Sequence, residues 1–262
     1  MSFARNDDVR IYYEVVGDGP PLLLHHGLAG TIENFTKRAD YVGALKDKYR
    51  LILMDARGRG RSSKPHEPEK HSMKHMTSDV VAVLDDLGID KANFWGYSMG
   101  GRVGLALGKY APDRFSSLII GGNGLSEKDS KPEMEELQGY IRLYKQGNEA
   151  VIASMEKNRG AKLPDWERTI WLNTDLDALI AYCSLYENIG MADYLPKVAI
   201  PCLLYAGELD TYPHSRAKAC AEIMPNAEFV TLPGLNHGGA FDAVSVALPH
   251  ILGFLEKVTQ RR

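Results

Sequence analysis

The sequence lacks the features that mark several specialised classes of protein. No apolar run reaches the length of a membrane-spanning helix, and the first eight residues contain no apolar core of a secretion signal. The formal net charge is only −3, from 31 basic and 34 acidic residues. This balance gives no reason to expect a nucleic acid or an anionic membrane as partner. We therefore expect a cytoplasmic protein.

Cysteine is scarce, and the usual cofactor and metal motifs are missing. Cys183, Cys202 and Cys220 form neither a C-x-x-C pair nor an even set for disulfides, so we expect buried thiols in a reducing compartment. There is no H-E-x-x-H or comparable ligand spacing, which predicts no metal. The glycine-rich segment 55–62 (D-A-R-G-R-G-R-S) lacks the Lys-Ser/Thr ending of a phosphate-binding loop, and we expect no cofactor.

What the sequence does contain is an alternation of short apolar runs and amphipathic segments. With 262 residues and 44% hydrophobic content, the chain is long enough for one large domain with an inserted lobe, or for two small domains. The alternation predicts a parallel sheet with helices on both faces. A β-rich run at 9–16, followed by a Gly/Pro turn, predicts an opening antiparallel hairpin. The predicted strands are 22–24, 51–54, 93–97 and 117–120, and the helices are 32–46, 73–87 and 99–110.

The alternation stops after Asn123 and resumes near Pro201. Between these points we find only helical segments, at 132–146, 148–158, 164–173 and 176–188. Beyond them, strands at 201–206 and 228–232 alternate with helices at 214–224 and 241–258. The prediction is an α/β fold with a doubly wound, mostly parallel sheet. Residues 1–125 and 195–262 form the core, and residues 126–194 form an inserted all-helical cap.

The most informative stretch is the G-x-S-x-G sequence around Ser98, flanked by Gly96 and Gly100. An apolar strand precedes it, and a helix rich in small residues follows it. Strand, sharp turn and helix are the context that a nucleophile elbow requires, because the turn admits only small neighbours. In this respect the chain resembles the α/β-hydrolase superfamily.

That resemblance implies an acid and a histidine in later loops that follow strands. A serine hydroxyl needs a base to remove its proton, and the base needs a third group to fix its tautomer. Asp210 follows the strand 201–206, and His237 follows the strand 228–232. Glu208 is the competing acid. The other histidines of this region, His214 and His250, lie within predicted helices.

Two further segments extend the resemblance over essentially the whole chain, apart from the cap. The sequence His26-Gly27-Leu28 is similar to the family's H-G-x loop, and the segment 55–62 matches its D-x-R-G-x-G-x-S pattern. The resemblance implies that the backbone N–H groups of Leu28 and Met99 form an oxyanion hole. It also implies that His26 braces its loop, and that the segment 55–62 shapes the site without reacting.

Serine at the nucleophile position argues against the branches in which aspartate attacks carbon directly. Ester or lactone hydrolysis, C–C bond hydrolysis and cofactor-free perhydrolysis remain open, and the loops look like those of small carboxylesterases and enol-lactonases. We expect a serine esterase that acts on a small-molecule ester or related acyl substrate. A triad-retaining small-molecule receptor is the alternative from another class. Candidate pocket residues in the cap are Trp166, Trp171, Tyr182 and Tyr186, although most cap aromatics are expected to fill the cap's own core.

Overall fold

The protein folds around one eight-stranded sheet with strand order β1-β2-β4-β3-β5-β6-β7-β8. Its computed structural model describes residues 2–125, 130–185 and 187–260. Strands β3 to β8 are parallel to one another. Strand β2 is antiparallel to both of its neighbours, β1 and β4. This confirms the predicted mostly parallel sheet. The strands are β1 Ser2–Asn6, β2 Val9–Val16, β3 Pro21–His25, β4 Arg50–Met54, β5 Ala92–Tyr97, β6 Phe115–Gly121, β7 Cys202–Gly207 and β8 Ala227–Leu232.

The opening hairpin differs from the prediction in its partner strand. The run 9–16 forms its hairpin with residues 2–6, which precede it and were not predicted as a strand. The two strands are joined by a turn in which Asp7 has φ 53°. Of β1, only Ala4 is buried, so this edge strand carries little of the apolar signal by which strands are recognised. On its other side β2 pairs with β4.

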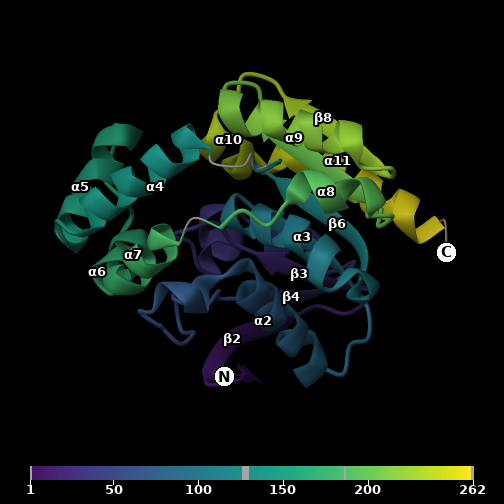
Figure 1. Cartoon of the computed structure of the whole chain (residues 1–262), viewed down its shortest axis with the longest axis horizontal. Helices are drawn as coiled ribbons and strands as arrows, with labels where there is room; N and C mark the ends of the chain where they lie inside the picture. Colours follow the sequence, from purple (N-terminus) through teal and green to yellow (C-terminus); the bar gives the residue numbers. More distant parts are fainter. Residues whose placement is uncertain (1, 126–129, 186, 261–262) are drawn as a thin grey trace.

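Helices cover both faces of the sheet, each over its own buried cluster (Figure 1). On one face lie α2 Met73–Asp86, α3 Met99–Tyr110 and α9 Thr211–Ile223; on the other lie η1 Asn34–Arg38, α1 Tyr41–Leu45, α10 His237–Asp242 and α11 Val244–Gln260. The middle strands β5, β6 and β7 are buried along their whole length. Burial on both faces explains their near-continuous apolar sequences.

Two predicted helices are interrupted. The segment 32–46 contains η1 and α1 instead of one helix, and the Asp40 carboxylate starts the second by accepting a hydrogen bond from the Gly43 N–H. The last helical region begins earlier than predicted, at His237, and is divided into α10 and α11. Short irregular helices complete the core: η2 Pro68–His71, η3 Pro112–Arg114 and η4 Leu195–Lys197.

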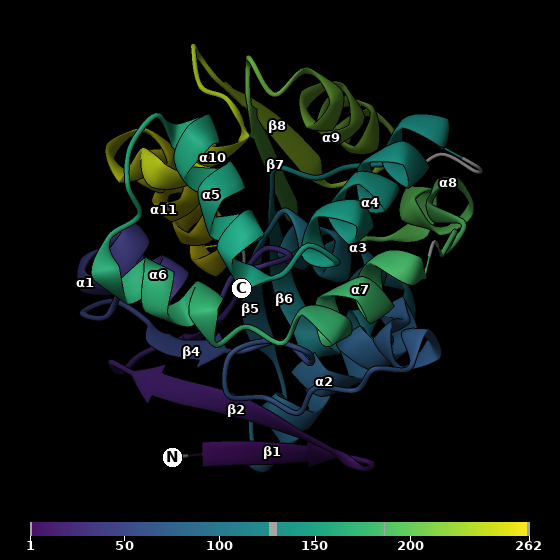
Figure 2. The same ribbon diagram turned by 90° about the vertical axis from the view of Figure 1, so that its left-hand side faces the viewer.

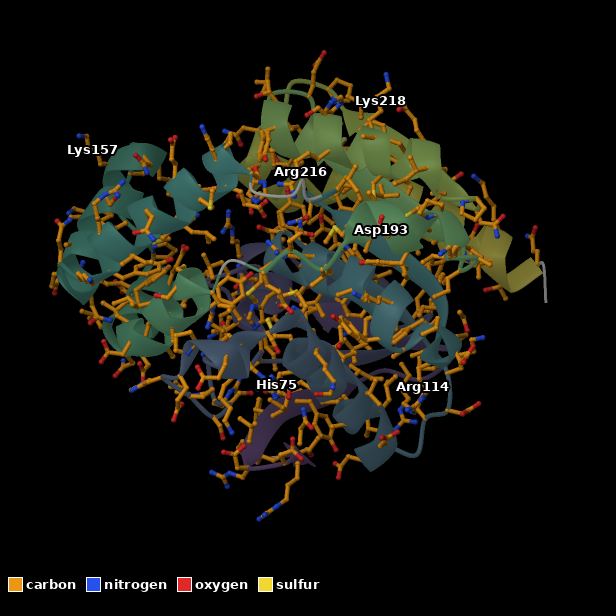
Figure 3. All side chains as sticks on the ribbon, in the orientation of Figure 1. His75, Arg114, Lys157, Asp193, Arg216 and Lys218 are labelled. Carbon is orange, nitrogen blue, oxygen red and sulfur yellow. The ribbon has the colours of Figure 1, made fainter. Side chains whose placement is uncertain are left out.

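The inserted helical region lies between β6 and β7, as predicted. It contains α4 Lys131–Tyr144, α5 Asn148–Arg159, α6 Asp165–Leu172, α7 Leu176–Ser184 and α8 Met191–Tyr194. Helices α4 to α7 contribute to a separate apolar cluster and stand together on one side of the sheet (Figure 2). Figure 3 shows the side chain of Lys157, from α5, on the outer side of this group.

An ion-pair cluster joins the inserted helices to the core. Glu133 of α4 accepts from Arg102 of α3 at 2.7 Å, and its other carboxylate oxygen lies 3.7 Å from Arg216 of α9. All three side chains are almost buried, so solvent screens the pairs weakly. Among the helices of the described residues, none is long and apolar enough to cross a membrane.

Candidate active site

Ser98 stands at the turn between β5 and α3 in a conformation that side chains rarely adopt. Its φ is 56° and its ψ is −114°, and it is the only residue of the stretch 92–100 that is not buried. A Cβ on Gly96 would come within 2.1 Å of the Gly100 carbonyl oxygen, and one on Gly100 within 2.2 Å of the His25 carbonyl oxygen. The two glycines of the motif are therefore required by space, while strain at Ser98 holds its side chain outward.

Asp210 and His237 meet beyond the ends of β7 and β8. An Asp210 carboxylate oxygen lies 2.6 Å from His237 Nδ1, and the hydroxyl of Tyr97 donates to the His237 carbonyl at 2.5 Å. The Asp210 side chain is 11% exposed and that of His237 is 42% exposed. The histidine is thus held from two sides while its ring stays open to the pocket described below.

The competing residues lie elsewhere. Glu208 is exposed and accepts a hydrogen bond from the Gly234 N–H at 2.9 Å. His214 bonds to the Thr231 hydroxyl, and His250 is exposed on α11. Of the two acids weighed from the sequence, Asp210 is the one in contact with His237.

A pocket of about 290 Å³ brings Ser98, His237 and Leu28 together under the inserted helices. Two of the predicted aromatics, Trp166 and Trp171, line it. Several other lining residues were not expected from the sequence: Arg38, Tyr97, Tyr140, Tyr144, Met155, Ile170 and Phe241. The residues on α4, α5 and α6 carry only the helical spacing of apolar residues, which does not distinguish a pocket wall from a core. Arg38 is charged and Tyr97 lies on β5, so neither carries this signal.

Of the other two aromatic candidates, Tyr182 does not line this pocket. Tyr182 of α7 forms an edge-to-face contact with His71, and the guanidinium of Arg59 lies over its ring. This position follows from the packing of α7 against α4 and η2. Tyr186 lies outside the described residues. Met99, the other residue of the proposed oxyanion hole, is the first residue of α3, where a backbone N–H has no partner within the helix.

His26 braces the loop that carries Leu28. Its Nδ1 bonds to the Gly27 carbonyl at 2.8 Å, and its Nε2 lies 3.0 Å from the Ala56 N–H. These partners require an imidazole that donates from Nδ1 and accepts at Nε2, which is the neutral form. Burial lowers the pKa of His26 to about 4, because the charged ring would lose its hydration. The Gly27 carbonyl belongs to the same peptide group as the Leu28 N–H, so His26 orients that donor.

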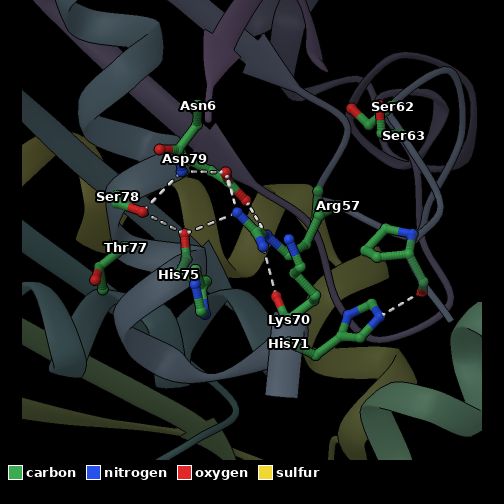
Figure 4. A network of polar contacts seen from close by, with 12 residues as sticks. Asn6, Arg57, Ser62, Ser63, Lys70, His71, His75, Thr77, Ser78 and Asp79 are labelled. Carbon is green, nitrogen blue, oxygen red and sulfur yellow. Dashed lines mark hydrogen bonds and ion pairs between the residues drawn. The ribbon is translucent and has the colours of Figure 1, made fainter. Parts of the chain in front are cut away.

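The segment 55–62 is fixed by its own polar contacts and by α2. The Asp55 carboxylate accepts from the backbone N–H groups of Ile32 and Arg61, each at 2.9 Å. Arg57 forms two hydrogen bonds of 2.6 Å with Asp79, and both side chains are fully buried (Figure 4). These contacts hold Asp55 and Arg57 within the fold, and the shaping role of the segment stays a prediction.

A potential metal-ligand group of the described residues lies outside this pocket. It consists of His66, Asp175 and Asp177, where His66 and Asp177 are exposed. Exposed acidic groups of this kind are common without an ion. The cysteines Cys183, Cys202 and Cys220 are buried and unpaired.

Buried histidines should make the fold sensitive to mild acid. Burial lowers the pKa of His25 to about 3 and that of His71 to about 4, alongside His26. At pH values between the usual histidine pKa of 6.5 and these lowered pKa values, the unfolded chain binds protons that the folded chain does not. The stability of the fold therefore decreases as the pH is lowered through this range. The exposed His66 acts in the opposite direction, because its contact with Asp175 raises its pKa.

We expect the free energy of unfolding to fall from pH 7 to pH 5, by up to about 1.4 kcal/mol per pH unit for each buried histidine. Urea unfolding at several pH values measures this slope. In His71→Gln, the dependence of the unfolding free energy on pH should decrease by about the contribution of one buried histidine. An unchanged slope in that variant would show that His71 is not neutral in the fold.

Comparisons with known proteins identify the family and agree with the fold. A family model described as alpha/beta hydrolase fold matches residues 20–171. The chain is 28% identical over 283 residues to "Putative carbamate hydrolase RutD" of Azorhizobium caulinodans, which covers 99% of this chain and 100% of that protein. It is 30% identical over 214 residues to 3-oxoadipate enol-lactonase 2 of Acinetobacter baylyi, with 78% and 77% covered. The crystal structure of a hydrolase from Pseudomonas aeruginosa PA01 has a TM-score of 0.83 at 23% identity, with 97% of each chain covered.

Proposed function

Because the chain belongs to the alpha/beta hydrolase fold family and is a hydrolase, we propose that it cleaves carboxylic ester bonds of small substrates through an acyl-enzyme on Ser98. The observation that carries this proposal is the 2.6 Å contact of Asp210 with His237 at the pocket that also contains the strained Ser98. A base and an outward-held hydroxyl that line one cavity, with an acid in contact with the base, are the groups that acyl transfer needs.

The first half-reaction transfers the acyl group to the protein. His237 Nδ1 donates to Asp210, which leaves Nε2 free to take the Ser98 proton as the hydroxyl oxygen attacks the ester carbonyl. The carbonyl oxygen becomes an oxyanion, which the N–H groups of Leu28 and Met99 stabilise. The tetrahedral intermediate then expels the alkoxide, which takes the proton from His237.

The second half-reaction restores the protein. Water enters the pocket, and His237 takes one of its protons. The resulting hydroxide attacks the carbonyl carbon of the acyl group that is bonded to the Ser98 oxygen. The second oxyanion collapses to the carboxylic acid, and His237 returns the proton to the serine oxygen. The balance is one water consumed for each ester cleaved, without redox change or cofactor.

A lactone is a cyclic ester, so the same groups open it without any change of mechanism. The relative named as an enol-lactonase makes lactones the second candidate class, and the relative named as a carbamate hydrolase adds carbamates to the panel. We therefore propose an assay of p-nitrophenyl esters, lactones, carbamates and β-diketones, each with the protein and with Ser98→Ala. Multiple turnover of esters or lactones supports the proposal. A single turnover with a retained covalent product would favour a receptor instead.

We propose that the cap, residues 126–194, decides which substrate reacts, while the core, residues 1–125 and 195–262, carries the chemistry. Trp166 is half-buried and lines the pocket, so Trp166→Ala should change the ranking of esters by acyl length. Lost apolar contacts of this kind are worth about 1–3 kcal/mol, or roughly tenfold to a few hundredfold between substrates. The measurement is kcat/KM over a chain-length series.

The matched control is Lys157→Ala, which removes an exposed side chain on the outer side of α5 (Figure 3). This variant should leave the order of the series unchanged. Trp171 is 5% exposed and belongs to the cap's apolar cluster as well as to the pocket, so its removal should also lower the melting temperature. If Trp166→Ala keeps the wild-type order, Trp166 does not determine specificity.

A further inference from the structure

The loop 55–62 carries two buried arginines that differ in their partners. Arg57 is neutralised by Asp79 (Figure 4), whereas Arg59, 3% exposed, has no carboxylate among its hydrogen-bond partners in the described chain. A buried charge normally persists only when it is paired. The unpaired guanidinium of Arg59 therefore calls for an explanation.

The contacts of Arg59 include Leu28, which lines the pocket, and Met99, which follows Ser98 in the chain. Its Nε donates to the Leu28 carbonyl, Nη1 lies 3.4 Å from the Arg57 carbonyl, and Nη2 lies 3.9 Å from Met99 Sδ. Its guanidinium carbon is 5.3 Å from the centre of the Tyr182 ring. A thioether is a weak acceptor and an aromatic face offers only modest attraction, so these neighbours compensate the charge poorly. Burial accordingly lowers the pKa of Arg59.

Leu28 and Met99 are also the two residues whose N–H groups form the proposed oxyanion hole. They come from different segments, the loop after β3 and the start of α3, and Arg59 contacts both. We propose that Arg59 is a positioning residue for the oxyanion hole, which it holds together from behind while its own positive charge stays unpaired. This inference rests on the proposed function, because it assumes that an oxyanion forms there.

The unpaired charge acts on the transition state more than on the bound ester. The substrate carbonyl is neutral, and negative charge develops on its oxygen only during attack by Ser98. In a site of low dielectric constant, a fixed cation in contact with the two residues that supply the donors stabilises that developing charge without reorganisation. Interactions that strengthen only in the transition state raise kcat and leave substrate binding unchanged.

The test is Arg59→Met, which keeps a long side chain and removes the charge and the donors. We expect kcat per active site, titrated with a serine-directed phosphonate, to fall by about tenfold to a hundredfold, less than the about 10²–10³ for loss of a donor itself. KM should change little. Affinity for phenylboronic acid, which forms an anionic tetrahedral adduct with a serine, should fall by a similar factor. Arg59→Lys, which retains the charge, should recover part of both losses.

The matched control is Arg10→Met, which removes an exposed cation of β2 that lies over the Phe3 ring, outside both the pocket and the segment 55–62. It should keep kcat, KM and boronate affinity within about twofold of the wild type, as expected for a surface charge. The proposal is overturned if Arg59→Met keeps its kcat per titrated site, if Arg10→Met loses as much, or if the loss of kcat is matched by an equal loss of folded protein in the melting curve. The activity of Ser98→Ala distinguishes a failure of the proposed function from a failure of this inference. An active Ser98→Ala refutes the proposed function. An inactive Ser98→Ala together with wild-type activity in Arg59→Met refutes only the role of Arg59.

Discussion

Ser98→Ala should reduce turnover of every substrate by about 10⁴ to 10⁶, because no other group can accept the acyl chain and triad members act as a unit. The fold should survive, since the change removes one hydroxyl that faces the pocket. The substitution leaves the Ser98 backbone hydrogen bonds to Gly121 and Arg102 in place. Initial rates on the substrate panel, with circular dichroism alongside, measure both effects.

Ser117→Ala is the matched control for the loss of a serine hydroxyl. Ser117 is fully buried on β6 and bonds to Asn93, away from the pocket. This variant should lose stability without losing activity per folded molecule. Wild-type activity in Ser98→Ala would refute the assignment of the nucleophile.

The second large effect is expected at the acid. Asp210→Asn replaces a carboxylate that fixes the His237 tautomer, so kcat should fall by about 10⁴ while the melting temperature changes little. An amide in this position presents either a donor or an acceptor to Nδ1, and the wrong choice leaves Nε2 protonated. Steady-state kinetics on one ester gives the ratio.

Glu208→Gln serves as the comparison, because Glu208 precedes Asp210 by two residues on the same loop but contacts Gly234 instead of His237. This variant should retain activity within about threefold, as is usual for surface substitutions. A larger loss in Glu208→Gln than in Asp210→Asn would mean that the acid is Glu208.

The sequence predicted the parallel sheet and the inserted helices because their signals are local. Buried strands such as β5 and β7 are short apolar runs, and Gly96 and Gly100 are required by the turn itself. The edge strand β1 was missed because it buries only Ala4. The break between η1 and α1 was also missed, since it depends on capping by Asp40 within a continuous helical pattern.

The contact of Asp210 with His237 was anticipated from chain order, but of the pocket's walls only Trp166 and Trp171 were anticipated. Tyr140 and Tyr144 of α4 line the pocket, whereas Tyr182 of α7 faces Arg59 and His71. Which face of a cap helix meets the pocket depends on how α4 packs against α7 and how α5 packs against α6. Such packing is set by distant side chains and leaves no periodic mark in the sequence.

An acyl-enzyme on Ser98 can be detected directly by mass spectrometry. The protein is mixed with a slowly hydrolysed p-nitrophenyl ester, quenched in acid within the burst phase, and its intact mass and peptides are measured. We expect one acyl group per chain, located on the peptide that contains Ser98 and absent from Ser98→Ala. Hydrolysis without any adduct, or an adduct of equal yield in Ser98→Ala, would contradict it.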